Sequence, residues 1–112
     1  MDTTRQNKVS RLVQKELSEI FQREVTDILM GTMISVTTTR ISPDMGNAKV
    51  YLSIFPTGNK LEVFKNIEAN NSRIRFLLGK RVGKQMRIIP ELQFYIDDSL
   101  DYSQRIDELL KD

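Results

Sequence analysis

The sequence predicts a two-layer α+β domain in which helices cover one face of a three-stranded sheet. Apolar residues recur at helical spacing over residues 5–24. Two runs of alternating apolar and polar residues then flank a turn-rich segment at residues 42–47, and a third apolar run surrounds Pro90. A chain of 112 residues is long enough for one hydrophobic core, so we expect a single domain over residues 1–112.

The first predicted element is an amphipathic helix over residues of about 5–24. Its apolar face consists of Val9, Leu12, Val13, Leu17, Ile20 and Phe21. A second face carries cations at positions i, i+3 and i+7, which are Lys8, Arg11 and Lys15. This row is either part of a basic binding surface or an ordinary solvated face. A solvated face is possible because three glutamates reduce the positive charge of this helix; they are Glu16, Glu19 and Glu24.

A β-hairpin is predicted after this helix. The segment 33–41 is rich in Ile, Val and Thr, which favour a half-buried strand. Its alternation leaves Ile41 out of phase, which predicts a bulge near Arg40. Residues 42–47 have the composition of a turn. The second strand follows, and its core-facing residues are Ala48, Val50, Leu52 and Ile54.

Residues 61–83 are predicted to form two helices separated by a kink. The kink is Asn70-Asn71-Ser72, because Asn tolerates a left-handed backbone and Ser is a favourable N-cap. The second helix begins at Arg73 and continues to the end of this segment. Its docking face has the spacing i, i+4, i+8 and consists of Ile74, Leu78 and Val82. A single continuous helix is the alternative interpretation.

A third strand is predicted between Ile88 and Ile96, and Pro90 restricts it to a sheet edge or to the start of the strand. A turn at Asp97-Asp98-Ser99 follows. The chain then forms a short C-terminal helix whose apolar residues are Tyr102, Ile106, Leu109 and Leu110. The predicted order of elements is therefore α-β-β-α-kink-α-β-α.

One basic block stands out in a chain whose net charge is only +2. Between Ala69 and Pro90 there are cations and no anion; the cations are Arg73, Arg75, Lys80, Arg81, Lys84 and Arg87. On a helix, Arg73, Lys80 and Lys84 fall within roughly 40° of one another. Such a block attracts polyanions, so nucleic acid is the first candidate partner, and a solvated helix face is the alternative. The neighbouring Phe76 and Leu77 are interpreted as core residues and not as platforms for base stacking.

The composition argues against an enzyme, a metal site and a membrane protein. The chain contains no Cys and no His, which removes thiolate ligands, imidazole ligands and a histidine general base. Asp97 and Asp98 are adjacent, but neighbours in a strand point to opposite faces and would not share a proton or a metal. No apolar stretch approaches the ~20 residues that span a bilayer, and no signal-peptide core follows Met1. We expect a cytoplasmic protein with no cofactor.

A specific pattern runs through nearly the whole chain in five stretches. They are Arg11-Leu12-Val13 with Glu16-Leu17 and Ile20; Ile41-Ser42-Pro43-Asp44-Met45 followed by Ala48-Lys49-Val50-Tyr51-Leu52-Ser53; Ser72-Arg73-Ile74-Arg75 with Leu78, Lys80 and Arg81; Ile89-Pro90-Glu91-Leu92-Gln93-Phe94 with Asp97-Asp98-Ser99; and Arg105-Ile106-Asp107-Glu108-Leu109-Leu110. In these stretches the chain resembles the ribosome-binding factor A family, bacterial assembly factors for the small ribosomal subunit.

This resemblance implies a KH-like fold, binding to the small (30S) ribosomal subunit near its decoding region, and a role in late maturation of its 16S rRNA. It implies neither catalysis nor a cofactor. The family has an Ala-x-Gly kink where this chain has Ala69-Asn70-Asn71, and Asn also adopts the backbone that a kink needs. The family tends to carry Asp-Pro-Arg after the first helix, whereas Asp27-Ile28-Leu29 keeps only the acid.

We predict that RNA contacts the kink, the helix after it and the first helix. The candidate residues are Asn70, Asn71, Arg73, Arg75, Lys80, Arg81, Lys84 and Arg87, with Arg5, Lys8 and Arg11 from the first helix. We expect the protein to be a monomer. Its expected partners are the small ribosomal subunit and its 16S rRNA. Two alternatives remain open. One is a generic single-stranded RNA-binding module, and the other is a protein-interaction adaptor that uses the polarity between basic residues 1–90 and acidic residues 91–112.

Overall fold

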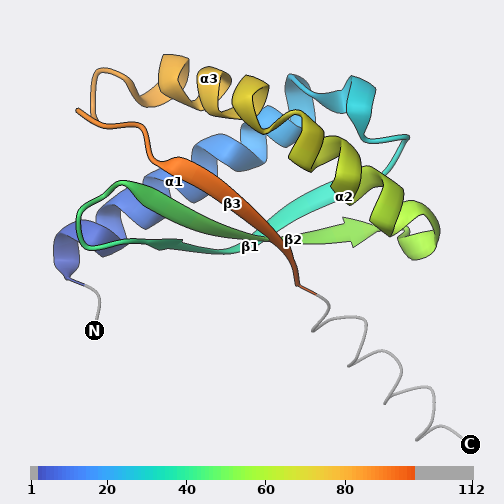
Figure 1. The fold of residues 1–112 in the computed structure, drawn as a ribbon, viewed down its shortest axis with the longest axis horizontal. Helices are drawn as coiled ribbons and strands as arrows, with labels where there is room; N and C mark the ends of the chain where they lie inside the picture. The colour runs from blue at the N-terminus through green and yellow to red at the C-terminus, as the bar shows by residue number, and fades with distance from the viewer. Residues whose placement is uncertain (1–2, 98–112) are drawn as a thin grey trace, which may run out of the picture.

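Three helices pack on one face of a three-stranded sheet in the computed structural model, which describes residues 3–97 (Figure 1). The elements are α1 (Thr4–Arg23), β1 (Met33–Ile41), β2 (Asn47–Phe55), α2 (Lys60–Ala69), α3 (Asn71–Val82) and β3 (Glu91–Ile96). Short 3₁₀ turns lie at Thr26–Ile28 and Thr57–Asn59. The predicted two-layer α+β architecture is thereby confirmed. The predicted turn beyond Asp97 and the predicted C-terminal helix lie outside the described residues.

Helix α1 begins at a capping box. The Thr3 hydroxyl accepts a hydrogen bond from the Gln6 backbone N–H, and the Gln6 side-chain oxygen accepts one from the Thr3 N–H. The amide of Gln6 also donates to the carbonyl of Ile41, 3.0 Å away, which ties the start of α1 to the end of β1. The apolar face predicted for this helix packs on the sheet, and its end at Arg23 lies within one residue of the prediction.

The strands lie in the order β1-β2-β3, with β1 antiparallel to β2 and β2 parallel to β3. Strand β3 is therefore an edge strand, as Pro90 predicted, but it begins at Glu91 and not at Ile88, so Pro90 precedes the strand. The bulge predicted near Arg40 is misplaced, because the register shifts between Val36 and Thr38. The Thr37 hydroxyl donates to the Asp97 carboxylate at 2.6 Å, and this long-range bond accompanies the change of phase.

The kink between α2 and α3 is present, but its backbone is not left-handed. Asn70 joins the two helices with φ −105°, and its N–H and side-chain amide both donate to the carbonyl of Asn66. Helix α3 restarts at Asn71 and not at Arg73, so Ser72 is not its N-cap. Because the hydrogen bonds to Asn66 hold the kink in an ordinary region of backbone space, it does not require a glycine.

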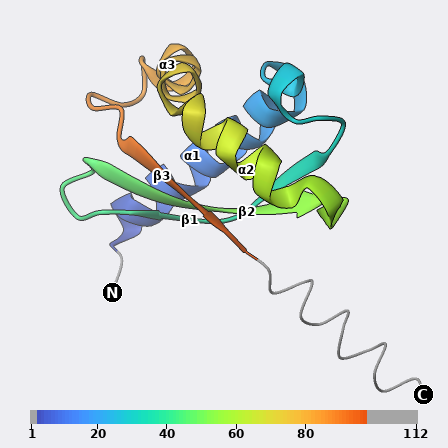
Figure 2. The same cartoon turned by 45° about the vertical axis from the view of Figure 1, so that its right-hand side comes forward.

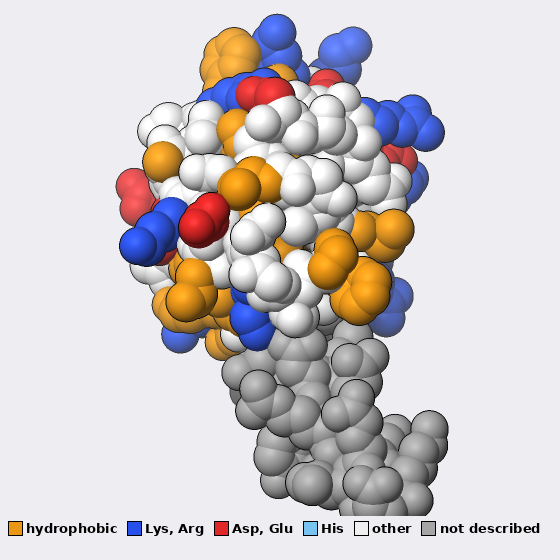
Figure 3. Space-filling view, turned by 90° about the vertical axis from the view of Figure 1, so that its right-hand side faces the viewer, with side chains coloured by type: hydrophobic (Ala, Val, Ile, Leu, Met, Phe, Trp, Pro, Cys, Tyr) orange, Lys and Arg blue, Asp and Glu red, His pale blue; other side chains and the backbone are white. Residues whose placement is uncertain are grey.

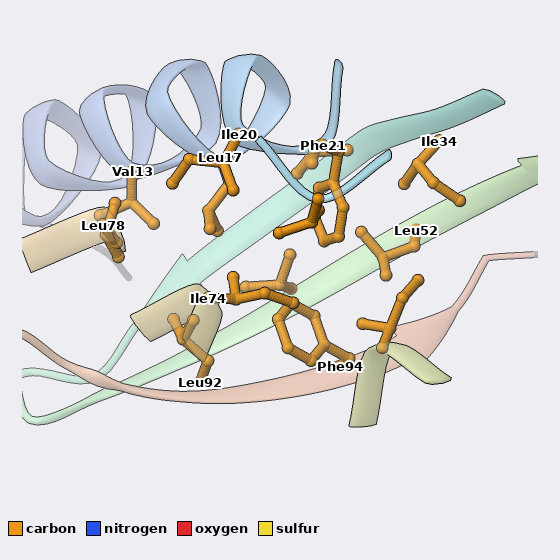
Figure 4. Close-up of a cluster of buried hydrophobic side chains, with 14 of the residues drawn as sticks. Val13, Leu17, Ile20, Phe21, Ile34, Leu52, Ile74, Leu78, Leu92 and Phe94 are labelled. Carbon is orange, nitrogen blue, oxygen red and sulfur yellow. The ribbon is translucent and has the colours of Figure 1, made fainter. Parts of the chain in front are cut away.

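One core lies between the helical layer and the sheet. Helix α3 docks through its predicted stripe of Ile74, Leu78 and Val82, all of which are fully buried. Side chains from α1, α3 and the three strands point into this core (Figure 4). The rings of Phe21 and Phe94 meet edge to face, with centroids 6.1 Å apart. This packing fixes which side of α3 faces solvent.

Candidate nucleic-acid interface

The cations predicted along α3 do not form one row on one helix. Helix α3 ends at Val82, so Lys84 lies in the turn that follows it. Arg73 lies at the opposite end of the helix, in its first turn. The contacts of each predicted cation therefore differ from those of the others.

Arg73 is paired with a carboxylate, contrary to the prediction that it is presented freely to RNA. Its two terminal nitrogens lie 3.0 and 3.1 Å from the two carboxylate oxygens of Asp27, and it also donates to the carbonyl of Glu24. The guanidinium lowers the pKa of Asp27 below its ordinary value, and Asp27 in turn raises the pKa of Arg73. This fork joins the start of α3 to the segment after α1.

Arg81 is held even more closely, by three glutamates of α1 and its C-cap. Its guanidinium nitrogens lie 3.0 Å from Glu16, 2.6 Å from Glu19 and 3.3 Å from Glu24. Its side chain is only 23% exposed, and the bond to Glu16 leads the causes that raise the pKa of Arg81. The glutamates that dilute the charge of α1 are therefore the partners of an arginine that clamps α3 to α1.

Arg75 is partly engaged by the backbone. Its Nε donates to the carbonyl of Pro90 at 3.1 Å, and one terminal nitrogen donates to the carbonyl of Ile89 at 2.7 Å. These bonds satisfy two carbonyls just before β3. The guanidinium is exposed and pairs with no carboxylate among residues 3–97.

The kink residues also use their amides within the protein. Asn71 donates to the carbonyl of Leu92 at 2.9 Å, and Asn70 donates to that of Asn66 at 2.8 Å. Both side chains are half-buried. At the opposite end of α2, where the helix starts, Lys and Arg side chains are interspersed with acidic and apolar ones (Figure 3). The kink is thus tied to the edge strand and carries no concentrated positive charge of its own.

Within the described part of the basic block that follows Ala69, Lys80, Lys84 and Arg87 remain exposed and form no ion pair, as is also true of Arg75. The ammonium of Lys80 lies over the ring of Phe76, 5.0 Å from its centroid. This contact leaves the charge facing solvent next to an aromatic surface.

Phe76 is 63% exposed, so the prediction that it belongs to the core is wrong. At about 100° per residue, Phe76 lies roughly 160° around the helix from the buried Ile74. Helical phase alone would therefore have identified it. Leu77, predicted as core with it, packs partly buried against the core.

Phe76 and Lys80 line a cleft of about 610 Å³ on the outer side of α3. The other lining residues are Ser72, Arg75, Gly79 and Ile89. None of the lining residues is acidic. Gly79 contributes no side chain to the cleft, and Ile89 packs closely over it, because a Cβ at this position would lie 3.5 Å from the Ile89 side chain. The cleft offers an aromatic ring, two cations and a hydroxyl, which suits a nucleotide.

The α1 cations Arg5, Lys8 and Arg11 are exposed and form no ion pair among the residues described. Arg5 lines a second hollow of about 590 Å³, which it shares with Arg87 and with Asp44. The hydroxyl of Ser42 and the N–H of Gly46 lower the pKa of Asp44. Ile88 lines this hollow and its neighbour Ile89 lines the first, so the two sites lie on either side of one segment.

Within the described range, no three carboxylates gather into a group that could hold a metal ion. The same residues include no helix with the length and apolar character needed to cross a membrane.

Comparison with known sequences identifies relatives over nearly the whole chain. A model of the ribosome-binding factor A family matches residues 5–110. Ribosome-binding factor A of Cytophaga hutchinsonii is 44% identical over 110 residues, which cover 98% of this chain and 83% of that protein. Its counterpart in Flavobacterium psychrophilum is 41% identical over 111 residues, with coverage of 98% and 85%.

Solved structures agree with the fold. The crystal structure of ribosome-binding factor A from Thermus thermophilus matches with a TM-score of 0.66 at 22% identity, over 81% of this chain and 94% of that one. The solution structure of a Thermotoga maritima protein described as a putative ribosome-binding factor A matches at 0.62 and 22%, over 85% and 90%. A homology model of the T. thermophilus factor, fitted into a cryo-EM map of its complex with the 30S subunit, matches at 0.62 and 23%, over 80% and 91%. The predicted KH-like fold is confirmed.

Proposed function

Because the chain belongs to the ribosome-binding factor A family, we propose that it binds the small (30S) ribosomal subunit and assists late maturation of its 16S rRNA. It acts by binding and not by catalysis, as a cytoplasmic monomer without a cofactor. The complex of the T. thermophilus relative with the 30S subunit supports the choice of partner.

The observation that carries this proposal is the cleft beside α3. It joins the exposed ring of Phe76 to the exposed ammonium of Lys80, with no acidic residue in its lining. Unpaired RNA bases stack on aromatic rings, and cations contact the phosphates between them. Lys84 and Arg87 extend the same charge beyond the end of the helix.

The interface we propose is therefore smaller than the set predicted from sequence. Lys80, Lys84, Arg87 and Arg75 make the direct contacts, and Arg5, Lys8 and Arg11 extend them from α1. Arg73 and Arg81 act indirectly, because their bonds to carboxylates set the position of α3. Asn70 and Asn71 likewise shape the kink that precedes it.

The test is co-sedimentation of the Lys80→Glu/Lys84→Glu variant with purified 30S subunits. We expect most of the binding to be lost. A matched control, Arg23→Glu/Lys65→Glu, reverses two exposed cations outside the candidate set and should co-sediment as the wild type does. Equal binding by both variants, with circular dichroism showing intact folds, would remove the α3 surface from the interface.

A generic single-stranded RNA binder is a second candidate, which the exposed Phe76 favours because base stacking is tolerant of sequence. Affinity for an unrelated oligonucleotide equal to that for the 30S subunit would support it. The adaptor alternative makes a different prediction, because binding to a protein partner would survive treatment of the complex with RNase.

A further inference from the structure

The face of the sheet opposite the helices carries a second set of side chains suited to RNA. The three α-helices of residues 3–97 lie on one side of the sheet (Figure 2). The exposed, alternate residues of the strands therefore form an open face. At its centre, two adjacent rows run across the sheet: one is Arg40, Lys49 and Gln93, and the other is Thr38, Tyr51 and Tyr95.

Arg40 and Lys49 are direct cross-strand partners, and both are exposed. Like charges placed opposite each other destabilise an antiparallel pair. Neither cation forms an ion pair within residues 3–97. The fold therefore tolerates a repulsion that an anionic ligand would relieve.

Tyr51 and Tyr95 stack beside this pair. Their ring centroids are 5.2 Å apart with an interplanar angle of 25°, and Tyr95 is 39% exposed. The Tyr95 hydroxyl donates to the side-chain oxygen of Gln93, 3.3 Å away, which fixes the ring over the sheet. Residues two apart along a strand are about 6.7 Å apart, so the rings and the cations present one continuous surface.

Acidic residues lie at the two ends of β3 and not at the centre of this face. Glu91 is exposed at the start of the strand, and Asp97 follows its end. The carboxylate of Asp97 accepts the hydrogen bond from Thr37. The centre of the open face therefore combines aromatic rings with unpaired positive charge.

We propose that this open face is an additional binding site for single-stranded RNA. A base stacks on the Tyr51–Tyr95 pair, and the neighbouring phosphates lie on Arg40 and Lys49. A sheet that offers rings for stacking next to cations is a general solution for unpaired nucleotides. A protein partner fits less well, because the centre of the face offers repelling cations. This site lies on the opposite side of the sheet from the α3 cleft and extends the proposed function.

The decisive variant is Lys49→Glu, which replaces the repulsion with an Arg40–Glu pair. We expect its thermal midpoint to stay the same or to rise, while its affinity for a fluorescein-labelled oligouridine hexamer falls. The slope of that affinity with salt should weaken by roughly 0.7 for each phosphate that is no longer bound. Fluorescence anisotropy measures the affinity. Lys65→Glu, which makes the same charge change at an exposed site on α2, should bind as the wild type does. If Lys49→Glu does not fold, Lys49→Gln replaces it in the same affinity measurement, and we again expect weaker binding of the hexamer.

The stacking half of the site is tested by Tyr95→Ala against Tyr95→Phe. We expect at least about fivefold weaker binding of the hexamer for the alanine variant and a change within about twofold for phenylalanine, which keeps the ring. Unchanged hexamer affinity in both Lys49→Glu and Tyr95→Ala would overturn the proposal. A lowered thermal midpoint with unchanged affinity would do the same, because it would show that these side chains stabilise the fold and do not bind the hexamer.

Failure of this site can be separated from failure of the proposed function. Lys80→Glu/Lys84→Glu tests the α3 surface against 30S subunits, whereas the sheet variants are tested against the free hexamer. If only Lys80→Glu/Lys84→Glu loses binding, to the 30S subunit, the proposed function stands and the open-face site is rejected. If only the sheet variants lose binding, to the hexamer, the open-face site is supported by itself.

Discussion

Asn71 donates from its side-chain amide to the backbone carbonyl of Leu92, 2.9 Å away, and thereby ties the kink between α2 and α3 to the edge strand. By its resemblance to the family, the chain would be expected to have the kink glycine at position 71. The bond gives the asparagine a role that a glycine could not perform.

We predict that Asn71→Ala lowers the free energy of unfolding by about 1 kcal/mol, because it leaves the carbonyl of Leu92 without this partner. Urea denaturation followed by circular dichroism measures the change. Asn7→Ala, an exposed site on α1, is the control and should cause no loss. A stability equal to that of the wild type would show that the bond contributes nothing to holding β3.

Arg81 should stabilise the fold and make no direct contact with RNA. Replacing it with methionine removes three charged hydrogen bonds and leaves three glutamates of α1 and its C-cap close together. We predict a loss of about 2 kcal/mol in the free energy of unfolding. Arg23→Met, at an exposed site at the end of α1, is the matched control. Equal effects of the two changes in urea would argue against the clamp.

The Asp27–Arg73 pair predicts a specific acid dependence. The pKa of Asp27 is lowered from 3.8 in the folded protein, so its contribution to stability is fully present above pH 3.8 and is lost as the pH falls through the lowered value. In Arg73→Gln, the carboxyl pKa of Asp27 measured by NMR titration should return toward 3.8.

Asp44 is the internal control for that titration. Its pKa is lowered by the hydroxyl of Ser42 and the N–H of Gly46, not by Arg73. It should therefore stay lowered in the variant. A joint return of both carboxyls would indicate a general loss of structure and not the loss of one ion pair.

Phe76 and Leu77 are neighbours with opposite expected effects. Phe76→Ala should change the free energy of unfolding by less than about 0.5 kcal/mol, because the ring is exposed, but should weaken hexamer binding several-fold. Leu77→Ala should lower stability by more and leave binding unchanged at temperatures where it is folded, because this side chain packs against the core. Thermal melts and anisotropy separate the two. Identical behaviour would contradict the assignment of the cleft.

Local periodicity was sufficient to predict most of the elements. The spacing of Leu17 and Ile20 defined α1, the stripe of Ile74, Leu78 and Val82 defined how α3 docks, and Pro90 placed β3 at an edge. Each of these signals lies within a few residues of chain, where backbone geometry fixes which side chains share a face.

Parts of the candidate site were predictable and parts were not. The exposure of Phe76 follows from helical phase, because it lies on the side of α3 away from the buried stripe. The bulge at Thr37 is accompanied by a hydrogen bond to Asp97, sixty residues later, and no spacing in the sequence indicates that partner. The stacked tyrosines on the open face meet only because β3 pairs with β2 in parallel register.

The elements, the buried stripe of each helix and the basic block after residue 69 could all be read from the chain itself. Which cations of that block are available depends instead on the packed molecule. Arg73 meets Asp27 across forty-six residues and Arg81 meets Glu19 across sixty-two, and each pairing neutralises a charge that looks free in the sequence. The physical reason is that burial depends on local periodicity, whereas the partner of a long charged side chain depends on how distant elements pack.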